Sequence, residues 1–217
     1  MKILIINPNS NPAMTKAVGR TAAAFAGGSY ETECRSTPGA PKFIETYKDA
    51  AQATLGMLAL VCENESECDA FVVACHCDPN LDLLKEATAK PVVGIGEASM
   101  KIASMLGHRF SVLSSARHSI PNKEALIRSY HLEGLLASVR AVERGDYVKA
   151  GRAAIDKDGA EVIVLGCAGM TGLDKKLQAR IGAPVLDGVI CGLILAYGLA
   201  RYGVGTSKVR RYAPVFE

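Results

Sequence analysis

The sequence has little net charge, no long apolar run and no regular cysteine spacing, and each absence excludes a class of protein. A formal net charge of +3 over 217 residues is too weak to indicate a nucleic-acid partner. The longest apolar run, Val189–Ala200, is shorter than the roughly 18 residues of a membrane span, and the four apolar residues near the N-terminus are too few for a signal-peptide core. The seven cysteines do not have the spacing of a small disulfide-bonded domain. We therefore expect a cytoplasmic protein with reduced thiols and with no nucleic-acid or membrane partner.

Short apolar runs alternate with segments of helical period along the whole chain, and hydrophobic residues make up 49% of it. This alternation predicts an α/β fold with parallel sheets. The expected strands are Lys2–Asn7, Tyr30–Cys34, Phe71–Cys75, Pro91–Ile95, Arg109–Leu113, Leu136–Val142, Glu161–Leu165 and Pro184–Leu186. The expected helices are Thr15–Phe25, Ile44–Glu63, Asp78–Thr88, Ala98–Leu106, Pro121–Tyr130, Asp146–Asp156 and Ile190–Arg201, the last folding back onto the first half.

Two stretches of the chain repeat one pattern. In residues 71–96 and again in residues 161–188, a buried strand runs into a cysteine, a helix follows, and the next strand begins at a proline. The repeat predicts two pseudo-symmetric lobes, each with a mostly parallel four-stranded sheet flanked by helices. We expect residues 1–97, completed by about 202–217, to form lobe 1 and residues 98–201 to form lobe 2.

The cysteines of the two repeats, Cys75 and Cys167, are the candidate catalytic residues. Ligands of parallel sheets bind at the carboxyl ends of the strands, where the loop after Asn7 and the pair Ser114-Ser115 also lie. A thiolate on one side of a carbon acid can remove a proton while a thiol on the other side donates one, and this chemistry needs no metal or cofactor. A helix N-terminus after each cysteine would lower the thiol pKa and bind an enolate oxygen.

Eight motifs together resemble the Asp/Glu racemase superfamily, and within it the hydantoin racemase family, which includes allantoin racemases. The matching segments are IINPNSNPAMT at 5–15, FIETYKDA at 43–50, VVACHCDPNLD at 72–82, PVVGIGEA at 91–98, FSVLSS at 110–115, VIVLGCAGM at 162–170, PVLDGV at 184–189 and TSKVRRYAP at 206–214. The resemblance implies a cofactor-independent racemase of 5-substituted hydantoins, assembled as a homo-oligomer. It also implies that Cys75 and Cys167 exchange the roles of acid and base, with substrate contacts from Asn7, Ile44, His76, Cys77, Ser114, Ser115, Ala168 and Gly169.

The chain departs from the family pattern directly after the first cysteine. It has His76 and Cys77 where relatives carry an apolar or aromatic residue and then a small one, which leaves the substrate side chain open. A racemase of aspartate or glutamate is the nearest alternative, although those relatives carry Asn-Thr after the first cysteine. A binding or thiol-redox protein on the same fold is the non-enzymatic alternative. A metal site at Cys75-His76-Cys77 lacks a second ligand pair with zinc-like spacing, and Gly94-Ile95-Gly96 is too short a match for a dinucleotide motif.

Overall fold

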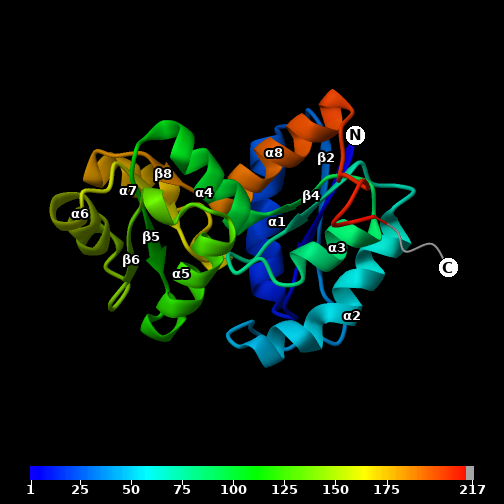
Figure 1. Ribbon diagram of the computed structural model, residues 1–217, viewed down its shortest axis with the longest axis horizontal. Coiled ribbons are helices and arrows are strands. Elements are labelled where there is room, and N and C mark those ends of the chain that lie inside the picture. The colour runs from blue at the N-terminus through cyan, green and yellow to red at the C-terminus, as the bar shows by residue number, and fades with distance from the viewer. Residues whose placement is uncertain (214–217) are drawn as a thin grey trace.

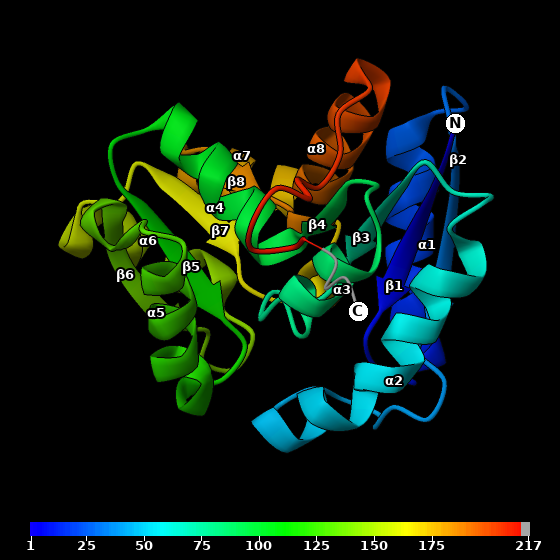
Figure 2. The same cartoon turned by 45° about the vertical axis from the view of Figure 1, so that its right-hand side comes forward.

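The computed structural model describes residues 1–213 and contains two four-stranded sheets in which all strands are parallel. The first half comprises β1 (Lys2–Asn7), α1 (Pro12–Ala26), β2 (Glu31–Ser36), α2 (Tyr47–Asn64), β3 (Ala70–Val73), α3 (Leu81–Ala87), β4 (Val92–Gly94) and α4 (Ile95–Leu106). The second comprises β5 (Phe110–Ser114), α5 (Ile120–Ser129), β6 (Leu136–Ala141), α6 (Tyr147–Asp158), β7 (Val162–Leu165), α7 (Asp174–Ile181), β8 (Val185–Leu186) and α8 (Gly188–Tyr202). Short 3₁₀ turns η1 (Arg117–Ser119), η2 (Glu133–Leu135) and η3 (Ala168–Met170) complete the order. The predicted α/β class with one sheet in each half is confirmed (Figures 1 and 2).

The two sheets have the same strand order. The first is β2-β1-β3-β4 and the second is β6-β5-β7-β8, so β1, β3, β5 and β7 are the inner strands. Inner strands of a parallel sheet are covered on both faces and are therefore apolar throughout. Strand β1 shows this pattern, because Ile3 and Ile5 pack into one core cluster while Leu4 and Ile6 pack into the cluster on the opposite face.

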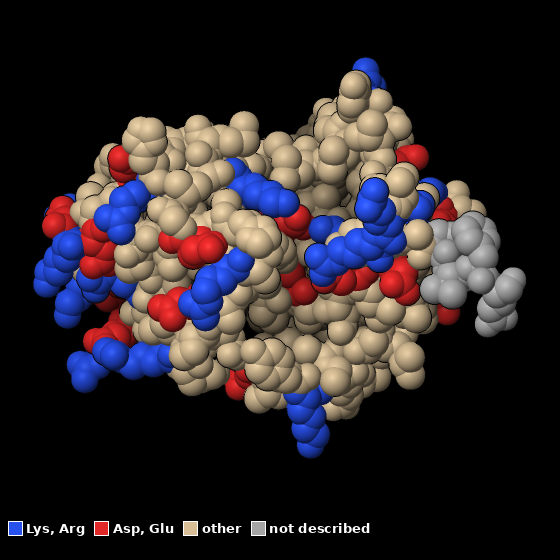
Figure 3. Space-filling model, in the orientation of Figure 1, with Lys and Arg blue, Asp and Glu red and all other residues tan. Residues whose placement is uncertain are grey.

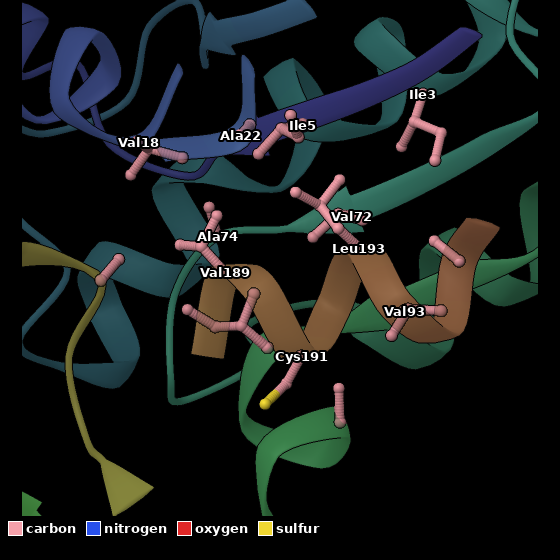
Figure 4. Packing of buried hydrophobic residues seen from close by; sticks show 14 of the residues in the cluster. Ile3, Ile5, Val18, Ala22, Val72, Ala74, Val93, Val189, Cys191 and Leu193 are labelled. Atoms are coloured by element: carbon pink, nitrogen blue, oxygen red, sulfur yellow. The ribbon is translucent and has the colours of Figure 1, made fainter. Parts of the chain in front are cut away.

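Helix α8 packs against the first sheet, as the sequence predicted for residues 190–201. Leu193 and Val189 belong to the same buried cluster as Ile5 and Val72 (Figure 4). Gly192 permits the close approach, since a Cβ atom there would lie 2.9 Å from Cγ1 of Val72. The predicted lobe boundaries, residues 1–97 for lobe 1 and 98–201 for lobe 2, stay a prediction.

The segment after α8 runs along the first half. The Thr206 amide donates to the Ala89 carbonyl (2.8 Å), and the Lys208 ammonium donates to the carbonyls of Lys85 and Glu86 (2.7 Å each). Residues 214–217 of the predicted lobe-completing segment, and Pro214 of its motif, lie outside the described residues. Through residue 213, none of the helices combines the length and the apolar composition that crossing a membrane requires.

Two helices of the first half begin later than the sequence predicted. Helix α2 starts at Tyr47 because Thr46 and Asp49 form a reciprocal capping box, which leaves Ile44 in the preceding loop. Helix α3 starts at Leu81, and Asp78 adopts a positive φ of 44°. The predicted start of this helix at Asp78 is therefore wrong.

Candidate functional site

Both candidate cysteines lie just beyond the carboxyl ends of inner strands. Strand β3 ends at Val73 and β7 at Leu165, each two residues before its cysteine. Both thiols are partly buried. They lie close enough for the charge of Cys75 to raise the pKa of Cys167, in addition to the larger effect of burial. The repeat thus brings one thiol from each half into a single electrostatic environment, and the molecular surface is hollowed between the two halves, where α5 and α2 approach each other (Figure 3).

Cys77 adds a third thiol beside the first. Its Sγ atom lies 3.2 Å from Sγ of Cys75, and its side chain is exposed. The hydrogen bond with Cys77 and burial both raise the pKa of Cys75, whereas the same hydrogen bond lowers the pKa of Cys77. In this pair Cys75 therefore acts as the hydrogen-bond donor, and Cys77 loses its proton more easily than Cys75.

His76 turns away from the thiols into the protein interior. Its ring is 2% exposed, and Nε2 lies 3.4 Å from the Ser99 hydroxyl of α4. Nδ1 is buried without a hydrogen-bond partner among the described residues. Burial, with a smaller effect of the Lys123 charge, lowers the pKa of His76 well below its ordinary value, so the imidazole is neutral at physiological pH. Its predicted contact with substrate stays a prediction.

Asp78 fastens the loop after β3 to the start of α4. Its carboxylate accepts hydrogen bonds from the amides of Gly96 (2.9 Å) and Glu97 (2.6 Å) and from the Tyr130 hydroxyl (2.8 Å). Gly94 and Gly96 make room for it, because a Cβ atom would lie 2.3 Å from Oδ1 at the first position and 2.7 Å from Oδ2 at the second. This packing requirement explains the Gly-Ile-Gly segment.

Helix α5 joins the second half to the first at the site. Tyr130, directly after its last turn, makes the hydrogen bond to Asp78, and near its N-terminus Asn122 accepts a weak one from Tyr47 of α2 (3.4 Å). Between them lies Lys123, which is 7% exposed and donates to the carbonyl of Gly166 (2.6 Å). A buried ammonium therefore lies beside the loop that carries Cys167.

The sequence did not identify Lys123 and Tyr130 as site residues. The available signal was their spacing with Ile127, since positions 123, 127 and 130 fall on one face of a helix, and Ile127 is 1% exposed. A lysine on the apolar face of an amphipathic helix indicates a buried cation.

Three other predicted residues make their contacts within their own halves of the chain. Asn7 is fully buried, and its amide donates to Asn9 (3.0 Å) and Thr15 (2.8 Å), so it organises the loop after β1. Ser114 is also buried and shares a hydrogen bond of 2.6 Å with Ser119. Ile44 is half-buried against the core cluster that contains Leu4.

Three predicted residues contact the second thiol or adjoin it. Burial raises the pKa of Cys167, and the exposed Ser115 hydroxyl acts on this thiol in the opposite direction. The Gly169 amide points at Sγ of Cys167 over 3.4 Å, and the buried Ala168 begins turn η3. In residues 1–213 no three histidine, cysteine or acidic side chains are grouped so that they could hold a metal ion.

Comparisons with known proteins show one family of similar sequences and structures. The family model described as "Asp/Glu/Hydantoin racemase" matches residues 3–196. Hydantoin racemases of Pseudomonas sp. and Rhizobium meliloti are each 36% identical to the chain, over 98% of its length and 91% and 94% of theirs. The allantoin racemase structure from Klebsiella pneumoniae superposes with a TM-score of 0.93 at 31% identity, covering 100% of this chain and 95% of that one.

Proposed function

We propose that this protein, which belongs to the Asp/Glu/hydantoin racemase family, racemises 5-substituted hydantoins, which are cyclic ureides of the allantoin type. Cys75 and Cys167 exchange a proton with the two faces of the C5 carbon. The observation that carries the proposal is the pair of thiols, one from each half, that lie within electrostatic range of each other at the strand ends.

The reaction begins with one thiolate and one thiol. The C5–H bond of a hydantoin lies next to a ring carbonyl, so removal of the proton by the thiolate gives an enolate in which the charge is delocalised. The opposite thiol then donates its proton to the other face of C5. The two cysteines have exchanged protonation states at the end, and the enzyme in this form accepts the product enantiomer for the reverse reaction.

The surrounding residues suit a neutral, polar ring. The imidazole of His76 is neutral and Lys123 is buried, so neither provides an open cationic site for the carboxylate of an amino acid. Neutral carbonyl and N–H groups of a cyclic ureide need hydrogen bonds rather than ion pairs. We therefore place a cyclic ureide ahead of aspartate or glutamate.

The decisive assay follows the optical rotation of single-enantiomer allantoin and 5-alkyl hydantoins in heavy water, with an enzyme-free control. We expect loss of rotation together with deuterium at C5. Ser in place of Cys75 or Cys167 should abolish racemisation, because a hydroxyl is a far poorer base than a thiol. Deuterium exchange on one enantiomer should survive where the remaining thiol is the base. Cys62→Ser, at an exposed thiol of α2, is the matched control and should keep full activity.

Two outcomes would contradict the proposal. Racemisation near the wild-type rate in both serine variants would exclude the two-base mechanism. No change with any hydantoin, together with exchange on an amino acid, would move the substrate class to amino acids. The expected cofactor independence and homo-oligomeric, cytoplasmic state belong to the same proposal, and assays without added metal, light scattering and cell fractionation test them.

A further inference from the structure

The ammonium of Lys123 is buried without a carboxylate partner. It is 7% exposed, and its one hydrogen bond among the described residues goes to the carbonyl of Gly166, the residue before Cys167. No carboxylate within residues 1–213 lies at ion-pair distance from it, whereas the partly buried Lys85 is paired with Glu97 at 2.7 Å. Removing an ammonium from water is costly unless an anion lies nearby, so Lys123 needs an anion that a carboxylate does not supply.

Helix α5 contacts both cysteine loops, and Lys123 makes the contact with the second. Lys123 and Tyr130 are seven residues apart and therefore lie two turns apart on one face of the helix. Tyr130 contacts Asp78 in the loop after β3, while Lys123 contacts Gly166 in the loop after β7. The face of α5 thus spans the two loops from which the thiols project.

Seven titratable groups meet at this face, among them Tyr130, which donates to Asp78. The charge of Lys123 acts on the thiols of Cys75, Cys77 and Cys167 and on the imidazole of His76, and Asp78 acts on Lys123. Asp78 already accepts three hydrogen bonds from other donors, and His76 is not an anion. The thiolates are therefore the counter-ions of Lys123.

We propose that Lys123 is a positioning residue that holds the three thiols of the site, Cys75, Cys77 and Cys167, at a single negative charge. This inference rests on the proposed two-base racemisation, which needs a base and an acid at the same time. One ammonium balances one thiolate, and a second ionisation would leave an uncompensated negative charge in a partly buried site. Because the same ammonium acts on Cys75 and on Cys167, it stabilises the thiolate on either side as the roles exchange.

The test measures thiol ionisation without substrate. Alkylation of each cysteine by iodoacetamide is followed by mass spectrometry from pH 5 to pH 10, and thiolate absorbance near 240 nm is recorded in parallel. In Lys123→Met and Lys123→Gln we expect the ionisation midpoints of the active-site thiols to move up by about one pH unit, which corresponds to a roughly tenfold slower alkylation at neutral pH. Lys123→Arg should restore most of the wild-type profile.

A lysine in a similar environment provides the control. Lys90 also donates to backbone carbonyls, those of Glu65 and Cys68, but at the amino ends of β3 and β4, opposite the strand ends that carry the thiols. Lys90→Met should leave the alkylation profile of the active-site thiols unchanged. Two uncharged variants are needed because methionine removes both the charge and the hydrogen bond to the Gly166 carbonyl and so can disturb folding. Glutamine removes the charge but can still donate that hydrogen bond.

Unchanged midpoints in both folded, uncharged variants would overturn the inference, as would an effect of Lys90→Met of the same size. In the racemisation assay the uncharged variants should lower kcat by tenfold or more with little change in KM, because the charge acts on the thiols rather than on substrate binding. The alkylation profile does not require turnover. A wild-type protein without hydantoin activity would therefore refute the proposed function, whereas the alkylation profile would still test the effect of Lys123 on the thiols.

Discussion

The buried carboxylate of Asp78 should make the stability of this protein depend on pH in the direction opposite to that of a salt-bridged aspartate. Burial raises the pKa of Asp78 from an ordinary 3.8 to about 6, although the hydrogen bonds from Gly96, Tyr130 and Glu97 act in the other direction. The native state therefore takes up a proton near pH 6, whereas the unfolded chain takes it up near 3.8. A raised pKa means that the group contributes stability fully below pH 3.8 and loses that contribution as the pH rises through about 6.

The size of the effect follows from the shift. A rise from 3.8 to about 6 corresponds to about 3 kcal/mol between the two protonation states. Asp78→Asn removes the titration while keeping an acceptor oxygen for one of the helix amides. The free energy of unfolding of the wild type, minus that of Asp78→Asn, should therefore increase by about 2 kcal/mol as the pH falls from 7 to 4, which is most of the full effect.

Urea unfolding followed by circular dichroism, at one protein concentration and with reductant present, measures this difference at each pH. Taking the difference cancels the titration of groups that the substitution does not affect. A difference that is constant above pH 4 would mean that the three hydrogen bonds outweigh burial and keep the carboxylate ionised. A difference that grows with rising pH would reverse the sign and refute the reasoning.

Two further predictions address the thiol pair and the helix packing. Cys77→Ala should lower the pKa of Cys75, because the hydrogen bond between the two thiols is the largest cause that raises this pKa. Alkylation of Cys75 should then begin at lower pH. A shift to higher pH would contradict the prediction. Gly56→Ala should lower the free energy of unfolding by about 1–3 kcal/mol, since its Cβ atom would lie 2.2 Å from the Pro38 carbonyl oxygen. Gly198→Ala, with nothing within 4 Å of its Cβ position, should raise it by about 0.5–1 kcal/mol, and equal effects at the two sites in urea unfolding would exclude the steric argument.

The strands and the strand-end cysteines could be predicted because the relevant signals are local. A short apolar run such as 70–73 or 162–165 is buried on both faces wherever it sits in a parallel sheet, and the residues after it then lie at the ligand-binding edge. The placement of Cys75 and Cys167 needs no knowledge of contacts between distant segments.

The errors concern residues whose partners are distant in the sequence. Asp78 precedes a proline and so has the local signature of a helix start, but its carboxylate binds the amides of Gly96 and Glu97, 18 and 19 residues away. Lys123 has the composition of a surface residue, and its burial depends on how α5 packs over Gly166, 43 residues further along. Such residues are found only when the halves are assembled.

The two halves fasten their cysteine loops with the same interaction in reversed arrangement. Aligning the repeats on their cysteines and on the prolines at 91 and 184 places Asp78 opposite Met170 and Gly94 opposite Asp187. In the first half the aspartate lies in the cysteine loop and reaches the start of α4.

In the second half the aspartate lies at the start of α8 and reaches the cysteine loop. Asp187 accepts hydrogen bonds from the Val189 amide (2.8 Å) within α8, and from the Thr171 hydroxyl (2.6 Å) and the Gly172 amide (2.8 Å) in the loop. Each half has one carboxylate that joins a helix N-terminus to the loop beyond a cysteine. In the first half the carboxylate comes from the loop, and Gly94 leaves space for it. In the second half it comes from the helix start, and the buried Met170 occupies the loop position that aligns with Asp78. Both halves therefore connect the loop beyond the cysteine to the following helix through one carboxylate, and the residue at each aligned position depends on which side supplies that carboxylate.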